Sequence, residues 1–144
     1  MTTSAMNAHG TLLKLGDGGG SEVFTTIAEV LDLSGPALAR GSLDATSHSS
    51  GGWKEKVAGI KDGGQVTFDI NWVPGNATHA NSTGLLSFFD DGELHNFQLV
   101  ENDASTLTWS FAAINTGFTT TKPVDGIRKG SITLDISGAV TYPV

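Results

Sequence analysis

Histidines and carboxylates are the residues of this sequence that could do acid–base or metal chemistry. The four histidines are His9, His48, His79 and His95. No two of them have the H-x3-H spacing at which one helix presents two imidazoles to a zinc ion. In DATSH, Asp44, Thr46 and His48 alternate, so they would point to the same side of a strand. A working site also needs a third ligand or a nucleophile with its base, which makes a solvated polar face the better interpretation.

Two further motifs have residue types that could bind an anion or a cation. The glycines of LGDGGGSE lack the Lys-Ser/Thr pair of a phosphate-binding loop and the spacing of a dinucleotide fingerprint, so we predict a hairpin turn there. Asp90, Asp91 and Glu93 could bind calcium or act as catalytic carboxylates, but they follow a predicted helix and fit a solvated turn better. We therefore predict that the protein is not an enzyme and uses neither a cofactor nor a metal ion.

The composition argues against several functional classes. The chain has no cysteine, which excludes disulfides, thiolate nucleophiles and cysteine zinc sites. Its 15 acidic and 8 basic residues give a net charge of −7, whereas nucleic-acid binders need a positive surface to neutralise phosphates. No segment approaches the ~20 apolar residues of a membrane span, and the N-terminus lacks the pattern of a secretion signal. We expect a single domain over residues 1–144, made in the cytosol.

Alternating apolar and polar residues predict a mainly antiparallel β fold. The clearest strand is QVTFDINWVPG, in which Val66, Phe68, Ile70 and Trp72 share one face. STLTWSFAA, GSITLDISG and ELHNFQLVEN show the same pattern. VFTTIAEVLDLSGP fits either a helical stripe or a strand, and its Val, Thr and Ile residues favour the strand. LARGSLDATSH then reads as a partner strand after a turn at Gly35-Pro36.

One segment has helical spacing instead. Leu85, Leu86, Phe88 and Phe89 predict a short amphipathic helix over about residues 82–91. Ser82 or Thr83 could cap its N-terminus, and Gly92 would end it. The predicted fold is thus an antiparallel β-sandwich or partly rolled barrel with one short flanking α-helix.

The segment SHSSGGWKEKVAGIKDGG, residues 47–64, places a tryptophan in a polar, glycine-rich context. Burying Trp53 alone gives roughly 5 kcal/mol at most, less than the roughly 10 kcal/mol or more that ordering about ten loop residues costs. Trp53 could pack on its own sheet as a lid over the core. Alternatively, the segment is a flexible loop that orders against a neighbouring subunit, which would add contacts from Val57 and Ile60.

Three stretches resemble the major tail tube proteins of long-tailed, siphovirus-type (lambda-like) bacteriophages. They are TTIAEVLDLSGP, LDATSHSSGGWKEKVAGIKDGGQVTF and DGIRKGSITLDISGAV. In that family an Ile-Ala-Glu-Val strand ends in a Gly-Pro-type turn, a second strand enters a variable loop, and a Gly-x-x-Asp-Gly-Gly turn opens the next strand. The likeness extends over residues 10–142 in the same order.

This resemblance implies a structural virion protein that assembles into stacked hexameric rings, the hollow tube through which phage DNA is ejected. It implies partners as well: other copies of the chain, a tape-measure protein inside the tube, and tail-tip or baseplate and tail terminator proteins at its ends. No C-terminal immunoglobulin-like domain, which some relatives carry, is expected. The 47–64 segment would contact a neighbouring subunit through Trp53, Lys54, Lys56, Val57 and Ile60.

The acidic composition would suit such a conduit. Six copies would carry 6 × −7 = −42 charges per ring. A partly negative lumen keeps DNA from adhering, so DNA would pass through without specific binding. No membrane partner is expected. The candidate lumen-facing residues are Glu29, Asp32, Asp44 and Asp69.

Three alternatives remain open at the level of sequence. A carbohydrate-binding β-sandwich could stack sugars on Trp53, Trp72 and Trp109, although the last two alternate with predicted core residues. A secretion-system tube subunit would share the architecture. An enzyme with a site around Asp44 and His48 is the weakest of the three.

Overall fold

The fold is built on one large antiparallel sheet. The computed structural model describes residues 3–80, 83–103 and 105–143. Seven strands are hydrogen-bonded in the order β2-β1-β7-β8-β9-β6-β3, and β4 and β5 form a separate two-stranded sheet. The strands are β1 (Leu12–Gly16), β2 (Phe24–Thr26), β3 (Val30–Ser34), β4 (Ala39–Asp44), β5 (Lys56–Asp62), β6 (Gln65–Asn71), β7 (His95–Val100), β8 (Thr108–Thr121) and β9 (Lys129–Ile136). No helix in the described part of the chain is long and apolar enough to cross a membrane.

The large sheet rolls around a single core. Its inner face carries Leu13, Phe68, Ile70, Phe97 and Ile132, all buried. The turn between β2 and β3 joins the two ends of the sheet, since the amide of Ile27 donates to Leu13 O at 2.9 Å and the amide of Asn71 donates to Glu29 O at 3.0 Å. The predicted fold class is therefore confirmed, in its partly rolled form.

Most of the predicted strands are confirmed. Val66, Phe68 and Ile70 of β6 and Ile132 and Leu134 of β9 are buried, as their alternation predicts. LGDGGGSE is the expected hairpin turn, because β1 and β2 on either side of it pair antiparallel. Strand β8 continues to Thr121, well beyond the predicted segment.

The prediction of one continuous strand over VFTTIAEVLDLSGP is wrong. The segment forms two short strands at opposite ends of the sheet, β2 beside β1 and β3 beside β6. The chain turns at Ala28-Glu29, where Glu29 has φ 60 and so leaves the extended conformation.

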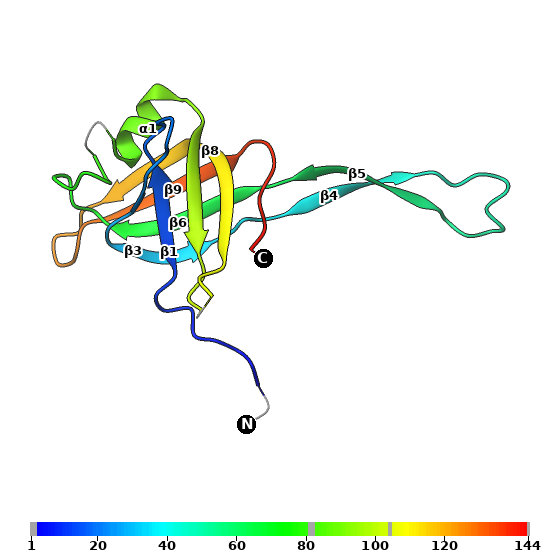
Figure 1. Cartoon of the computed structure of the whole chain (residues 1–144), viewed down its shortest axis with the longest axis horizontal. Coiled ribbons are helices and arrows are strands. Elements are labelled where there is room, and N and C mark those ends of the chain that lie inside the picture. The colour runs from blue at the N-terminus through cyan, green and yellow to red at the C-terminus, as the bar shows by residue number, and fades with distance from the viewer. Residues whose placement is uncertain (1–2, 81–82, 104, 144) are drawn as a thin grey trace.

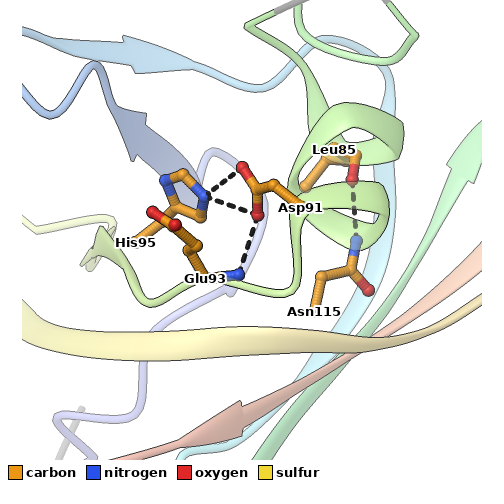
Figure 2. A network of polar contacts seen from close by, with 5 residues as sticks. All are labelled: Leu85, Asp91, Glu93, His95 and Asn115. Atoms are coloured by element: carbon orange, nitrogen blue, oxygen red, sulfur yellow. Dashed lines mark hydrogen bonds and ion pairs between the residues drawn. The ribbon is translucent and has the colours of Figure 1, made fainter.

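The predicted helix is confirmed as α1 (Leu85–Asp91), with Leu85 and Phe88 buried against the sheet. Its N-cap is Gly84 without a side-chain capping bond, so the prediction of Thr83 as the cap is wrong, and Ser82 lies outside the described residues. Gly92 ends the helix in the left-handed conformation, as predicted. Asn115 of β8 donates from Nδ2 to Leu85 O at 2.9 Å and ties the helix to the sheet (Figure 2).

The 47–64 segment is not a loop throughout. Its second half is β5, which pairs with β4 to make a long hairpin that projects from the rolled sheet (Figure 1). We call residues 39–62 the arm. The sequence suggested a loop because exposed strands need no apolar alternation, and backbone pairing with β4 supplies the order that buried side chains do not.

Candidate assembly surfaces

The arm is held together by its own two strands. Asp44 pairs with Lys56, Leu43 with Val57, and Arg40 with Lys61. The register shifts between Arg40 and Ser42, where Gly59 and Ile60 together oppose Gly41. A Cβ at Gly59 would lie 3.1 Å from Gly41 O, so the close approach of the two backbones at this β-bulge favours glycine.

The register gives the arm two different faces. Leu43 and Val57 lie opposite each other on one face and are 61% and 54% exposed. Ile60 follows on the same face at the bulge and is 90% exposed. The other face is mainly charged, with Arg40, Asp44, Lys56 and Lys61. An apolar stripe of this kind on an unpacked hairpin indicates a surface that another molecule covers.

The tip of the arm, residues 45–55, is a compact turn that ends in an exposed tryptophan. The amide of Ala45 donates to Glu55 O at 2.9 Å, the amide of Ser47 donates to Ser50 Oγ at 2.9 Å, and the amide of Trp53 donates to Ser50 O at 3.3 Å. The Trp53 side chain is 80% exposed, so the alternative in which it covers its own core is wrong.

Besides the short edge strand β2, two further strand edges of the large sheet are unpaired in the described structure. Strand β3 pairs with β6 on one side only. The second half of β8, from Phe118 to Thr121, pairs with β9 alone, because β7 covers β8 only up to Ala113. Beside β3 runs a slot of about 940 Å³, lined by Val30 to Gly35 on one wall and Ala8 to Thr11 on the other. Unpaired edges of this kind are sites where another strand can add.

Between these edges, the outer face of β3, β6, β9 and β8 is polar. Thr67 lies opposite Thr133, and Asp69 lies opposite Ser131. Ser131 in turn lies opposite Thr119 of β8. Thr67, Asp69 and Ser131 are exposed, while the alternate residues of β6 and β9 are buried in the core. The sheet thus presents a wide hydroxyl-rich surface to solvent.

The four candidate lumen residues do not all lie on this surface. Asp69 belongs to it, and Glu29 lies next to it, accepting a hydrogen bond at Oε2 from Asn71 Nδ2 at 3.1 Å. Asp32 is exposed on β3 at one edge. Asp44 is on the arm, in the other sheet, where hydrogen bonds from the side chain and amide of Thr46 lower its pKa. The structure therefore groups the first three and separates Asp44 from them.

Two of the four histidines, His79 and His95, have structural surroundings, whereas His9 and His48 are exposed. His79 is fully buried, accepts the amide of Val73 at Nδ1 (3.2 Å) and contacts Ala28 O through Nε2 (2.7 Å), which fixes its tautomer. His95 stacks on Phe88 with ring centroids 3.6 Å apart. It also pairs with Asp91 at 3.0 Å (Figure 2). Strand β4 ends at Asp44, so the expected alternation with Thr46 and His48 on one strand is wrong. Among the described residues, no group of three or more His, Asp or Glu side chains could hold a metal ion.

The three tryptophans do not form a common platform. Trp72 is 9% exposed and packs edge-on to Phe118 at 5.2 Å. Trp109 is partly buried and donates from Nε1 to Glu101 at 2.9 Å. Of the three, only Trp53 is exposed, which removes the geometric basis for a sugar-stacking surface.

The sequence identified only some of the exposed residues of the arm. It named Trp53, Lys54, Lys56, Val57 and Ile60, and all are exposed on the arm. It missed Leu43, whose contribution to the apolar face follows only from its register with Val57. It also missed strand β1 and, separately, the slot between β3 and residues 8–11.

Comparisons of the sequence and of the fold with known proteins lead to the same group of proteins. A family model described as lambda phage tail tube protein matches residues 15–142. No curated protein matches the chain significantly.

Several solved structures share the fold. One is the tail of an empty gene transfer agent particle refined with C6 symmetry, which is 23% identical over 97% of this chain and 100% of that chain, with a TM-score of 0.77. A second comes from the sheath/tube terminator of an extracellular contractile injection system, 18% identical over 100% of both chains, with a TM-score of 0.74. A third is the SPP1 tail tube, 11% identical over 93% of this chain and 77% of that chain, with a TM-score of 0.64.

Proposed function

The chain belongs to the lambda phage tail tube protein family, and on that basis we propose that its copies close into six-membered rings that stack into a tail tube. It is a structural component of a virion and assembles with itself into a tube. The match to a phage family favours a virion tail over an injection-system tube of the same architecture.

The free edges of β3 and of the second half of β8 carry the proposal. A ring needs a contact between two different surfaces of each subunit, repeated until it closes. Strand β3 supplies one such surface, and the second half of β8 supplies the other. The slot beside β3 has room for an extended strand of a neighbour. Six copies per ring follow the C6 symmetry of the gene transfer agent tail, whose fold this chain shares.

The polar outer face would then line the lumen. Pairing β8 of one subunit with β3 of the next continues the sheet, and its other face is already filled by the core. We propose Glu29, Asp32 and Asp69 as lumen-facing acids, because all three lie on or beside this face. Lys129 lies on the same face, opposite Asn71, but hydroxyl groups and carboxylates predominate there, which suits passage without specific binding.

The arm would contact a second subunit. Leu43, Val57 and Ile60 provide the apolar area. Trp53 and Lys54 belong to the tip, and Lys56 follows them at the start of β5. Other proteins complete the tail in this proposal: a tape-measure protein inside the tube, and tail-tip or baseplate and terminator proteins at its ends. We assign the chain no enzymatic activity, since its surfaces serve assembly.

Hydrogen exchange tests the edge pairing. The free-edge amides of Val30–Ser34 and of the second half of β8 should exchange quickly in the monomer and slowly in assembled tubes. The matched control is β6, which is paired on both sides and should be protected in both states. Equal exchange of the two edges in monomer and tube would contradict the proposed ring contact.

A further inference from the structure

A pocket of about 360 Å³ opens between α1 and the hairpin of β1 and β2. Leu15, Ala77 and Phe88 provide apolar walls, and Asp17 and Asp91 provide carboxylates. Its volume lies within the range of about 300–1,000 Å³ typical of ligand pockets. The pocket can therefore hold a large side chain that is apolar in its body and polar or positive at its border.

Both carboxylates of this pocket are held in the charged form. The amides of Gly19 and Val23 donate to Asp17 and lower its pKa. The amide of Glu93 donates to Asp91 at 2.8 Å, His95 lies 3.0 Å away, and both contacts lower the pKa of Asp91 (Figure 2). The pocket thus stays negative at neutral pH.

The tip of the arm has the complementary chemistry. Trp53 offers a flat apolar ring with one N–H donor, and it is 80% exposed. Lys54 directly follows it, and Lys56 is two residues further on, so positive charge flanks the ring. Seating the indole against Leu15 and Phe88 would bring these ammonium groups toward Asp17 and Asp91.

The chain cannot fill this pocket with its own tip. The arm projects away from the rolled sheet, and its tip and α1 lie toward opposite ends of the molecule (Figure 1). Its strands are hydrogen-bonded only to each other. A tip on one side and a receptor on the other form a head-to-tail contact, which either closes into a ring or repeats along a filament.

The other concave sites suit this tip less well. The pocket at the root of the arm, about 330 Å³, has apolar walls from Leu38, Val140 and Tyr142. However, Arg40 and Lys61 also line it beside one carboxylate, Asp62, so cations outnumber carboxylates there and would repel Lys54 and Lys56. The slot beside β3 is a long opening along a backbone edge and suits a strand.

We propose that Trp53 of one copy seats in the pocket between α1 and β1 of another copy, with Lys54 and Lys56 facing Asp17 and Asp91. This contact rests on the proposed function and adds to it the receptor for the arm. It makes α1 part of the assembly surface.

Cross-linking between two single-cysteine variants tests this contact, because the natural chain has no cysteine. Ser49→Cys labels the tip and leaves Trp53 and both lysines intact. Ala77→Cys labels the α1 pocket, and Ala139→Cys labels the pocket at the root of the arm as the matched control. All three positions are exposed, so each variant should fold. The Ser49→Cys protein is mixed with one of the other two, assembled, and treated with a short bismaleimide.

The proposed contact predicts a heterodimer with Ala77→Cys that is several-fold more abundant than the heterodimer with Ala139→Cys. Adding Lys54→Glu to the tip variant should reduce that yield several-fold, because the charge facing Asp17 and Asp91 is reversed. Tubes that cross-link to Ala139→Cys, or to neither position, would overturn the receptor assignment and leave the tube function standing. Failure of the wild-type protein to form tubes would count against both.

Discussion

At the scale of single residues, two tryptophans show how differently the chain uses the same side chain. Trp72 lies in the core, stacked on His79 with ring centroids 5.9 Å apart. Trp53 lies at the tip of the arm and is 80% exposed. Trp72 therefore stabilises the subunit, and Trp53 is free to stabilise contacts between subunits.

Alanine substitutions should separate these two roles. Trp72→Ala should lower the free energy of unfolding of the monomer by about 3–5 kcal/mol, the usual cost of truncating a buried aromatic side chain. Trp53→Ala should change it by less than about 0.5 kcal/mol but impair tube formation. Urea unfolding followed by circular dichroism measures the first effect, and sedimentation of assembled protein measures the second.

The opposite pattern would show that the assignment is wrong. A large loss of monomer stability in Trp53→Ala would mean that this side chain packs on its own subunit in solution.

At the scale of elements, alternation predicted the strands that the core requires. In β6 every second residue is buried, and the alternation of Val66, Phe68 and Ile70 therefore predicts this strand. The break between β2 and β3 could not be predicted in this way, because it depends on the backbone conformation of one residue, Glu29. Tertiary hydrogen bonds at Ile27 and Asn71 hold that turn, and sequence patterns do not reveal them.

The arm was predicted only in part, for a related reason. The strand expected over LARGSLDATSH is β4, but it pairs with β5 and not with the strand before it. The strands of the arm bury almost nothing, so no burial pattern marks β4 or β5. The sequence did indicate that Trp53 needs a surface beyond its own loop. It did not indicate that a paired hairpin presents this residue, and the free edges of β3 and β8 follow only from the order of the strands.

Shortening the arm tests its independence from the rest of the fold. Replacing residues 43–57 with an Asn-Gly turn should leave the monomer's melting temperature nearly unchanged, because the removed residues contribute nothing to the core. The shortened protein should fail to form tubes. Thermal unfolding followed by circular dichroism and electron microscopy of the same samples check the two outcomes.

A control for correct folding is available in the same molecule. The near-ultraviolet circular dichroism of Trp72 and Trp109, which are both outside the arm, should be retained in the shortened protein. Loss of that signal, or unimpaired tubes, would contradict the view that the arm acts only between subunits.

At the scale of the whole molecule, the chain exposes surfaces that a stable monomer does not need. It has an apolar arm, two unpaired strand edges and an open slot between β3 and the N-terminal segment. Each of these surfaces can be covered when identical copies surround the subunit. The family match and the shared fold of tail tubes and injection-system tubes explain why these features occur together.

Electron microscopy of the concentrated, purified protein tests the central claim most directly. If copies complete one another, hollow tubes of stacked rings should form, and averaged end views should show six-fold symmetry. A protein that stays monomeric at high concentration, with the arm folded against its own rolled sheet, would contradict the account.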